Sequence, residues 1–173
     1  MYIAIYDENK THISNVDNVS YDLTQRVYDP DTFSGDGVCV DDINDATVAV
    51  VCDDYGNSEY ACLVDNIKAD GRKRTIKGLD FKTLWDTEII LDFTADGSFN
   101  GKLSALFTTV KQAVFDSTDA TVCKIPVEVI IPTDNTDTTT TYGSYQGQYV
   151  ITNAYKFLKA YLKYYEYNIE SRY

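Results

Sequence analysis

The chain has 173 residues, 44% of them hydrophobic, which is enough for one ordinary domain or two small ones. Its 27 acidic and 15 basic residues give a formal net charge of −12, and this disfavours direct binding to the phosphates of DNA or RNA. No apolar run approaches the ~18 residues of a membrane span, and no secretory signal is recognisable at residues 1–8, so the sequence predicts neither.

From residue 1 to about residue 93 the pattern is one of short strands separated by turn residues. Alternating or continuous apolar residues predict strands at 2–6, 12–16, 19–28, 47–52, 59–67, 72–77 and 87–93. Turns at 53–57 and at Asp70-Gly71 make two of these pairs hairpins. Such a series is typical of an antiparallel β-barrel or sandwich.

Helical patterns interrupt and then follow the strands. A single turn is expected at 79–85 with Asp80 as its N-cap, and an amphipathic helix at 102–115 with Ser98 or Asn100 as its cap. Further along, the sequence predicts a loop at 96–101, a strand between Pro126 and Pro132, a polar loop at 133–141, a short strand at 142–149, and a helix at 151–165 with Thr152 near its start. Residues 167–173 resemble the start of another strand, from which we expect that the sequence continues and the chain is a fragment.

These elements predict a β-rich α+β fold. An antiparallel barrel or sandwich with a short plugging helix would be followed by an amphipathic helix, a strand and a C-terminal helix. We expect residues 1–95 to form the barrel domain and residues 96–173 to form a helix-strand-helix region that begins a second domain.

The cysteines and the single histidine are not spaced as metal ligands or as a nucleophile with its base. Cys52 and Cys62 fall within apolar strands, where cysteine is usually a small buried residue, and the lack of a signal favours reduced thiols. A cross-strand Cys52–Cys62 disulfide is the alternative. We expect His12, beside a turn, to be a surface residue.

Clustered carboxylates are the remaining candidates for chemistry. They would serve a glycosidase pair or a calcium site, and they are Asp41, Asp42, Asp45, Asp53 and Asp54. Aspartate is common in turns because it bonds to nearby backbone, so solvated turns are the favoured interpretation. A calcium loop of the EF-hand type starting at Asp53 would place Val64 where glutamate is needed, although another loop calcium site stays open.

No glycine-rich phosphate loop and no nucleophile elbow occurs in the sequence. The one basic cluster, Arg72-Lys73-Arg74, is expected to be a solvated hairpin flank. We therefore predict no catalytic, cofactor-binding or metal-binding residues, and a protein that is not an enzyme.

Three segments, residues 21–33, residues 62–67 and residues 74–85, together resemble siphophage tail-hub proteins, also called tail-associated proteins. Residues 21–33 resemble the family's opening strand with its acidic step before Phe33, and residues 62–67 its strand ending in an Ile-containing turn. Residues 74–85 resemble its strand, glycine and short helix, with Gly78 at the bend and Leu79, Leu84 and Trp85 plugging the barrel. The helices at 102–115 and 151–165 also match in place. Thr87 and Glu88 depart from the pattern, because the family usually has Arg there.

The resemblance implies the N-terminal hub module of a phage or prophage tail tip. Such a module has tail-tube-like barrels, forms a homotrimer that closes the distal end of the tail tube, and contacts the distal tail protein and the tape-measure protein. It would be made in the host cytoplasm and located in the virion. The acidic balance would let DNA slide past the lumen wall. The alternatives are a β-module for a carbohydrate or cell-surface ligand, with Trp85 or Tyr exposed on a concave sheet, and a hydrolase with two Asp in a cleft.

Overall fold

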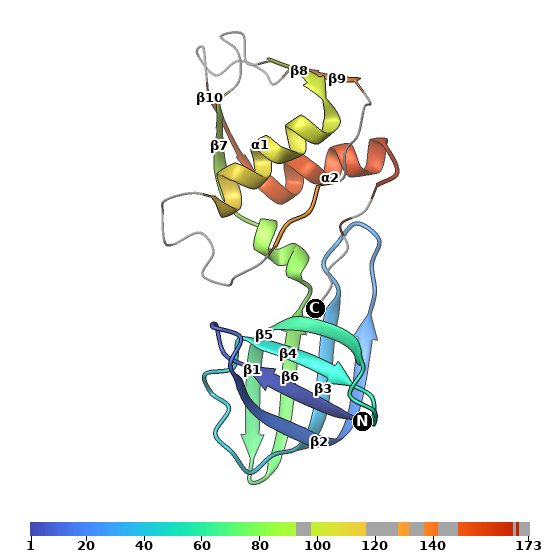
Figure 1. Cartoon of the computed structure of the whole chain (residues 1–173), viewed down its shortest axis with the longest axis vertical. Helices are drawn as coiled ribbons and strands as arrows, with labels where there is room; N and C mark the ends of the chain where they lie inside the picture. Colours follow the sequence, from blue (N-terminus) through green and yellow to red (C-terminus); the bar gives the residue numbers. More distant parts are fainter. Residues whose placement is uncertain (93–97, 117–127, 132–136, 142–148, 168, 170–173) are drawn as a thin grey trace. The chain divides into compact units, whose positions relative to one another are not determined.

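The computed structural model describes residues 1–92, 98–116, 128–131, 137–141, 149–167 and 169 (Figure 1). The chain divides into two compact units, one of Met1–Thr83 and one of Leu84–Tyr167. The division comes earlier than residue 95, where the sequence led us to expect it. The reason is that β7 (Glu88–Asp92) pairs with β10 (Tyr149–Asn153) and not with a barrel strand.

The first unit is a closed barrel of antiparallel strands, one of the two architectures that the sequence predicts, and its strand order is β1-β2-β3-β6-β5-β4. The strands are β1 (Tyr2–Tyr6), β2 (His12–Thr24), β3 (Thr32–Val38), β4 (Val48–Cys52), β5 (Ser58–Asp70) and β6 (Lys73–Leu79). The expected strands at 12–16 and 19–28 are a single strand, β2, and residues 25–28 lie outside it. The strand β3 was not predicted, because its Gly and Asp residues have low β-propensity.

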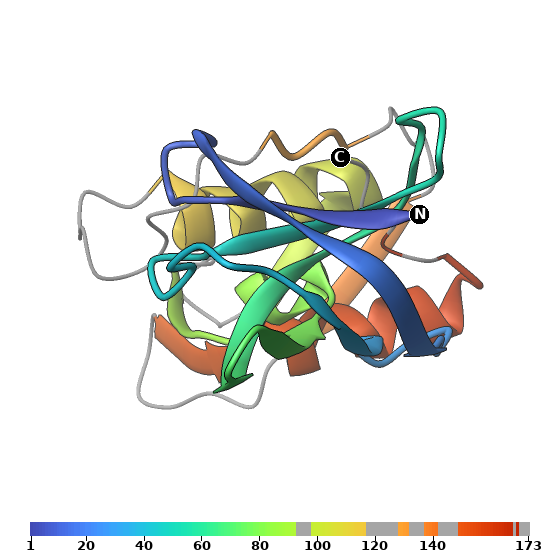
Figure 2. The same ribbon diagram turned by 90° about the horizontal axis from the view of Figure 1, so that it is seen from below.

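Two long strands bend within the barrel, because the two halves of each pair with different neighbours. The first half of β2 pairs with β1 as far as Asp17, and its second half pairs with β3. In the same way β5 pairs with β4 up to Leu63 and with β6 from there to Asp70. Irregularities mark both bends, between Asp17 and Ser20 in β2 and between Val64 and Asn66 in β5. Bulges of this kind bend a strand and increase its twist, which helps a sheet to close into a barrel (the sweep of β2, in blue, is visible in Figure 2).

Apolar side chains fill the barrel. The buried cluster consists of Ile3, Ile5, Val16, Phe33, Cys39, Ile43, Ala49, Val51, Cys62 and Ile76. Each large aliphatic side chain buried in this way contributes roughly 1.5–3 kcal/mol. The strand β4 is buried on both faces, since Val48, Val50 and Cys52 join Ala4 in a second cluster. This double burial explains why β4 reads as a continuous apolar run.

Residues that the sequence did not suggest help to plug the barrel. Cys39 and Ile43, from the loop between β3 and β4, enter the core. The short 3-10 helix η1 (Phe81–Trp85) contributes Phe81 to the second cluster. Leu84 and Trp85 belong to the other unit. There the Trp85 and Phe115 rings pack edge to face, with their centroids 4.8 Å apart. The plug formed by Leu84 and Trp85 stays a prediction.

Gly78 also has a different role from the one expected. It lies inside β6, before its end, so it does not form the bend into η1. A Cβ atom built on Gly78 would be 2.9 Å from the carbonyl oxygen of Leu63 and closer still to Sγ of Cys62. Glycine is needed here because β5 and its Cys62 side chain press against the backbone of β6.

The second unit contains two helices and two small sheets. Its remaining elements are β8 (Ser98–Lys102), paired with β9 (Asp137–Thr141), and the helices α1 (Leu103–Phe115) and α2 (Ala154–Tyr164). The helix α1 packs against β7 and α2, and its buried face is formed by Leu103, Leu106, Val110 and Val114. The predicted amphipathic helix and C-terminal helix are confirmed. None of the described helices is long and apolar enough to cross a membrane.

Several local predictions in this unit are wrong. Residues 98–102 and 137–141 form strands where loops were expected, and the β-branched threonines of β9 suit a strand. Lys102, and neither Ser98 nor Asn100, occupies the N-cap of α1, without a side-chain hydrogen bond. Thr152 lies near the start of α2 as expected, and Asn153 caps this helix by accepting from the Lys156 N–H at 3.0 Å. Residues 128–131 form no strand. Residues 142–148, most of 167–173 and Cys123 lie outside the described part of the chain.

Candidate functional site

Four of the five candidate carboxylates are exposed, those of Asp41, Asp42, Asp45 and Asp54, and Asp53 is half-buried. Asp53 accepts hydrogen bonds from the side chain and backbone of Asn57 and from the Tyr55 N–H, all at 2.8 Å. The bonds from Asn57 lower the pKa of Asp53. Asp42 accepts from the Asn44 N–H, and Asp54 pairs with the amino group of Met1. Within the described residues, no three His, Cys, Asp or Glu side chains are grouped so that they could hold a metal ion.

The three described cysteines, Cys39, Cys52 and Cys62, are free and buried. Cys52 is opposite Ser58 and Cys62 is opposite Ala49, and the two thiols belong to different clusters on the two faces of the sheet. The alternative of a Cys52–Cys62 disulfide is therefore wrong. Burial raises the pKa of the Cys62 thiol to about 12, so the thiol is protonated at neutral pH and is not a nucleophile.

His12 is exposed, as predicted, and is not part of a catalytic triad. Its Nε2 is 2.8 Å from Oδ1 of Asn15, and its ring meets the edge of Tyr6. Ser14 has a different partner, since its hydroxyl donates to Oδ2 of Asp41 at 2.5 Å. No imidazole reaches that hydroxyl, so the Ser14–Asp41 pair lacks the base that nucleophilic catalysis needs.

The Ser14–Asp41 bond lies where β2 and β3 separate. The last paired residues are Asp17 and Val38, and the next residue of β2, Asn18, has a left-handed backbone with φ of 54°. The strands are closely packed at this point, because a Cβ on Gly37 would be 2.5 Å from Cγ1 of Val16 and 2.7 Å from the Asp17 carbonyl oxygen. The separation is thus a fixed feature of the fold.

Beyond this point the two chains have different neighbours. His12–Val16 pairs with β1 alone. The segment after β3 follows the β5–β6 hairpin instead, since the Cys39 N–H donates to the Arg72 carbonyl at 2.9 Å and the Arg74 guanidinium donates to the Asp41 carbonyl at 3.2 Å. The Arg74 guanidinium of the basic cluster is therefore hydrogen-bonded to backbone carbonyl oxygens at the β5–β6 hairpin and in the segment after β3.

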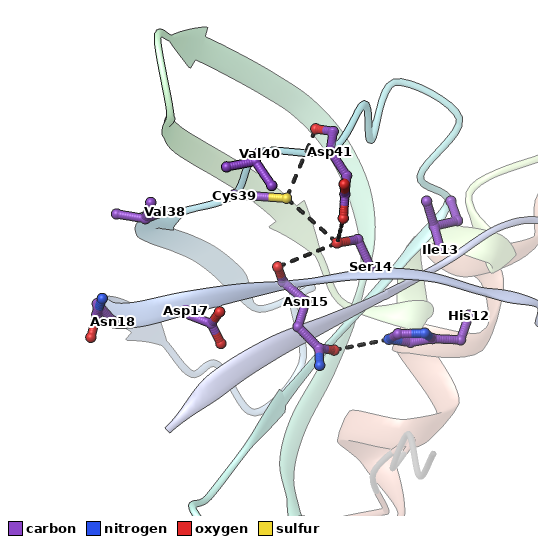
Figure 3. Close-up of a pocket in the computed structure, with 10 residues that line it drawn as sticks. All are labelled: His12, Ile13, Ser14, Asn15, Asp17, Asn18, Val38, Cys39, Val40 and Asp41. Atoms are coloured by element: carbon purple, nitrogen blue, oxygen red, sulfur yellow. Dashed lines mark hydrogen bonds between the residues drawn. The ribbon is translucent and has the colours of Figure 1, made fainter.

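The space between the two chains is an open hollow of about 480 Å³, which we call the edge groove (Figure 3). It is lined by His12, Ile13, Ser14, Asn15, Asp17, Asn18, Val38, Cys39, Val40 and Asp41. Ser14 and Cys39 are buried at 8% and 4% exposure, and their Oγ and Sγ atoms are 3.6 Å apart. Val38 and Val40 are exposed at 41% and 69%. Two carboxylates, and no Lys or Arg, line the groove.

A buried ion pair at the end of β6 was not predicted. Lys82 Nζ is 3.2 Å from Oδ2 of Asp80, and both side chains are at least nine-tenths buried. Lys82 Nζ also donates to the Arg26 carbonyl, and Asp31 accepts from the Arg26 N–H at 2.6 Å. The Asp80 N–H donates to the Asp31 carbonyl, and Oδ1 of Asp80 accepts from the Lys82 N–H, which confirms Asp80 as the cap of η1. The cluster fastens the β2–β3 loop to η1.

Comparison of the chain with models of known protein families, with curated proteins and with solved structures gives no match.

Proposed function

We propose that the chain is a structural, non-enzymatic module of a phage or prophage tail tip, in which it acts as the N-terminal hub module. The observation that carries the first part of this proposal is the filled barrel. Its interior is occupied by apolar side chains, and the loop carboxylates Asp42 and Asp53 are bonded to their own turns. A barrel packed in this way offers surfaces to other molecules and no chamber for a substrate.

The tail-hub part of the proposal rests on the resemblance of three segments, and their positions support it. Residues 21–33 run from the second half of β2 into β3, residues 62–67 lie in β5, and residues 74–85 cover β6 and η1. The strands β3, β6 and β5 are neighbours in the barrel. The segments that carry the resemblance therefore form one continuous sheet.

The buried polar cluster also joins two of these segments. Arg26 and Asp31 come from the first, and Asp80 and Lys82 from the third. A buried ion pair is costly unless both partners stay in place, so it fixes the arrangement of the loop and helix that it joins. This rigidity suits a module that must present the same surface to several neighbours.

In the proposed role, three copies close the distal end of the tail tube against the distal tail protein and the tape-measure protein. The net charge of −12 suits a lumen through which DNA passes without adhering. Such a module is assembled in the host cytoplasm and remains in the virion.

The carbohydrate-binding alternative has less support. Trp85, the single tryptophan, is only 7% exposed and packs against Phe115, so it is not presented to a sugar. Tyr55 and Tyr164 are exposed, but they lie in the β4–β5 turn and on α2, and not on a concave sheet face.

The proposal is tested on tailed particles purified from the host that carries the gene. Antibodies against the chain, detected with gold in the electron microscope, should label the distal tip of the tail, and mass spectrometry of the particles should contain its peptides. Absence of the chain from particles that are otherwise complete would refute the proposal. Labelling along the tube or on the head would refute the tip location.

A further inference from the structure

We propose that the turn between β4 and β5 of one copy of the chain docks on the exposed side of α2 in a second copy. The inference rests on the proposed function, in that copies of the chain meet one another, and it adds the two surfaces and the chemistry of that contact. We call the first surface the acidic turn (residues 53–59) and the second the basic helix face (Lys156, Lys163, Tyr164 and Tyr167).

Charge is distributed unevenly along the chain. Residues 27–67, which include the acidic turn, contain ten acidic residues and no Lys or Arg. Residues 154–167, which include α2, contain Lys156, Lys159 and Lys163 and a single acidic residue, Glu166. The chain as a whole has a net charge of −12, so the basic helix face is a local exception. Surfaces of opposite sign attract one another and repel surfaces of their own sign, which selects the acidic turn as a partner for this face.

The acidic turn presents an aromatic side chain on a fixed backbone. Tyr55 at its tip is 92% exposed, and the side chain of Asp54 beside it is 84% exposed. The carboxylate of Asp53 holds the turn in shape, because it accepts from the backbone N–H groups of Tyr55 and Asn57. A ring that is already held in place loses little conformational entropy on binding, which makes Tyr55 a suitable anchor.

The basic helix face places lysines beside a second group of aromatic rings. Lys156 and Lys163 are exposed and lie two helical turns apart on the same side of α2. Tyr164 is 80% exposed and Tyr167 is 42% exposed. The Tyr165 ring lies between these two, with its centroid 4.9 Å from that of Tyr164 and 6.3 Å from that of Tyr167. Ammonium groups and aromatic rings therefore share the exposed side and the C-terminal end of α2.

The two surfaces match each other in both respects. Among the described Phe, Tyr and Trp residues, the exposed ones are Tyr55, Tyr164 and Tyr167. They lie in two places, one beside carboxylates and the other beside ammonium groups. In the proposed contact the Tyr55 ring packs against Tyr164 and Tyr167, and the carboxylates of the turn face the lysines of α2. Tyrosine is favoured at such contacts because its ring is apolar and its hydroxyl is polar.

The contact also accounts for a closed assembly. It joins two different surfaces, so a copy that uses its acidic turn on one neighbour keeps its basic helix face for another. Contacts of this heterologous kind close into rings when the rotation between copies allows it, and a trimer uses each surface once in every copy. A contact between two acidic turns would bring like charges together and is disfavoured.

The test uses the full chain, as a mixture of light copies and copies enriched in heavy nitrogen, at high protein concentration. A carbodiimide joins a carboxylate to an amine in contact with it, and mass spectrometry identifies the joined peptides. We expect a link from the acidic turn to Lys156 or Lys163 in which one peptide is light and the other heavy. Its yield should fall as salt is added. The link between Asp54 and the amino group of Met1, which pair within the chain, is the internal reference.

Four matched variants locate the contact. Tyr55→Ala and Tyr164→Ala should each lower the yield of the light–heavy link about fivefold or more, as expected when an anchor of an interface is truncated. Val27→Ala and Ile90→Ala also truncate exposed apolar side chains, and they should leave the yield unchanged. All four side chains are exposed, so each variant should keep the fold of the parent.

Three results would overturn the inference. The first is that light–heavy links are missing, or that every link joins two peptides of one copy. The second is that the control variants lower the yield as much as the tyrosine variants. The third is that Lys156 and Lys163 are linked, in tailed particles, to a different virion protein and not to a second copy. If any of these occurs while gold labelling places the chain at the tail tip, the proposed function stands and this contact alone is wrong.

Discussion

The substitution Gly78→Ala should destabilise the barrel through a collision that the structure locates. The added methyl group would lie 2.9 Å from the Leu63 carbonyl oxygen and nearer to Sγ of Cys62. Overpacking of a core costs about 1–3 kcal/mol, and we expect the upper end because the Leu63 oxygen is backbone and yields little. Removing glycine from a strand returns about 0.5–1 kcal/mol. The net loss is therefore about 2 kcal/mol, or roughly 8–16 °C in Tm for a domain of this size.

A double-mutant cycle with Cys62→Ala isolates the responsible contact. Cys62→Ala removes the sulfur atom and should itself cost about 1 kcal/mol by leaving a small cavity. In the double variant the methyl group of residue 78 takes up part of that space. The loss of stability in the double variant should therefore be smaller than the sum of the two single losses by about 1 kcal/mol or more. Urea unfolding of the full chain, followed by circular dichroism, measures all four proteins. Gly71→Asn is the control, because Gly71 has φ of 58° with no atom within 4 Å of a Cβ there, and asparagine tolerates that backbone.

Two results would refute this reasoning. One is a Gly78→Ala protein within about 0.5 kcal/mol of the parent, which lies in the range of ordinary surface substitutions. The other is strict additivity with Cys62→Ala, which would mean that the two side chains do not meet.

Three further predictions concern buried and hydrogen-bonded titratable groups. Lys82→Met should lower the free energy of unfolding in urea by about 3–5 kcal/mol, because it removes the cation that is paired with the buried Asp80 carboxylate. The double variant Lys82→Met with Asp80→Asn should recover part of this loss. A Lys82→Met protein as stable as the parent would show that the pair is not buried. The pKa of Cys62 is raised from 9.0 to about 12 in the folded chain, so the unfolded chain loses the thiol proton at a lower pH than the folded chain. The contribution of the protonated thiol to stability is therefore complete below about pH 9 and is lost as the pH rises toward 12. Cys62→Ala should reduce the fall in Tm over this alkaline range. The hydrogen bonds from Asn57 lower the pKa of Asp53 in the folded chain, so the Asp53 carboxylate contributes to stability above its unfolded pKa, and this contribution is lost as the pH falls through the folded pKa. Asp53→Ala should speed hydrogen exchange of the Asn57 amide at neutral pH, because that amide donates to Asp53. Unchanged exchange would contradict the role of Asp53 in the turn.

The parts of the fold that the sequence predicts are those with a strong local pattern. The strand β4 is apolar throughout because both of its faces are buried, and α1 shows helical spacing because one face packs against β7. Asp80 has the position of a cap, and it caps η1. In these cases the local sequence pattern agrees with the burial or the hydrogen bonding that the folded chain shows.

The misses come from contacts made across the chain. Gly35 and Gly37 suggest a loop, yet β3 needs them because β2 and the core lie too near for a side chain. The bends of β2 and β5 depend on which strand each half meets. The edge groove is lined by residues 12–18 together with residues 38–41. The Lys82 ammonium of the buried ion pair donates to the carbonyl oxygen of Arg26, which is far from it in the sequence. No periodicity within one segment shows such sites.

The central claim is that this chain acts through surfaces that bind other chains. Zero-length cross-linking of purified tailed particles, followed by mass spectrometry, tests it most directly, because a carbodiimide joins a carboxylate only to an amine in contact with it. The account predicts that exposed carboxylates of this chain are joined to lysines of a different virion protein. Particles in which the chain is present but every cross-link of these carboxylates is internal, or absent altogether, would contradict it.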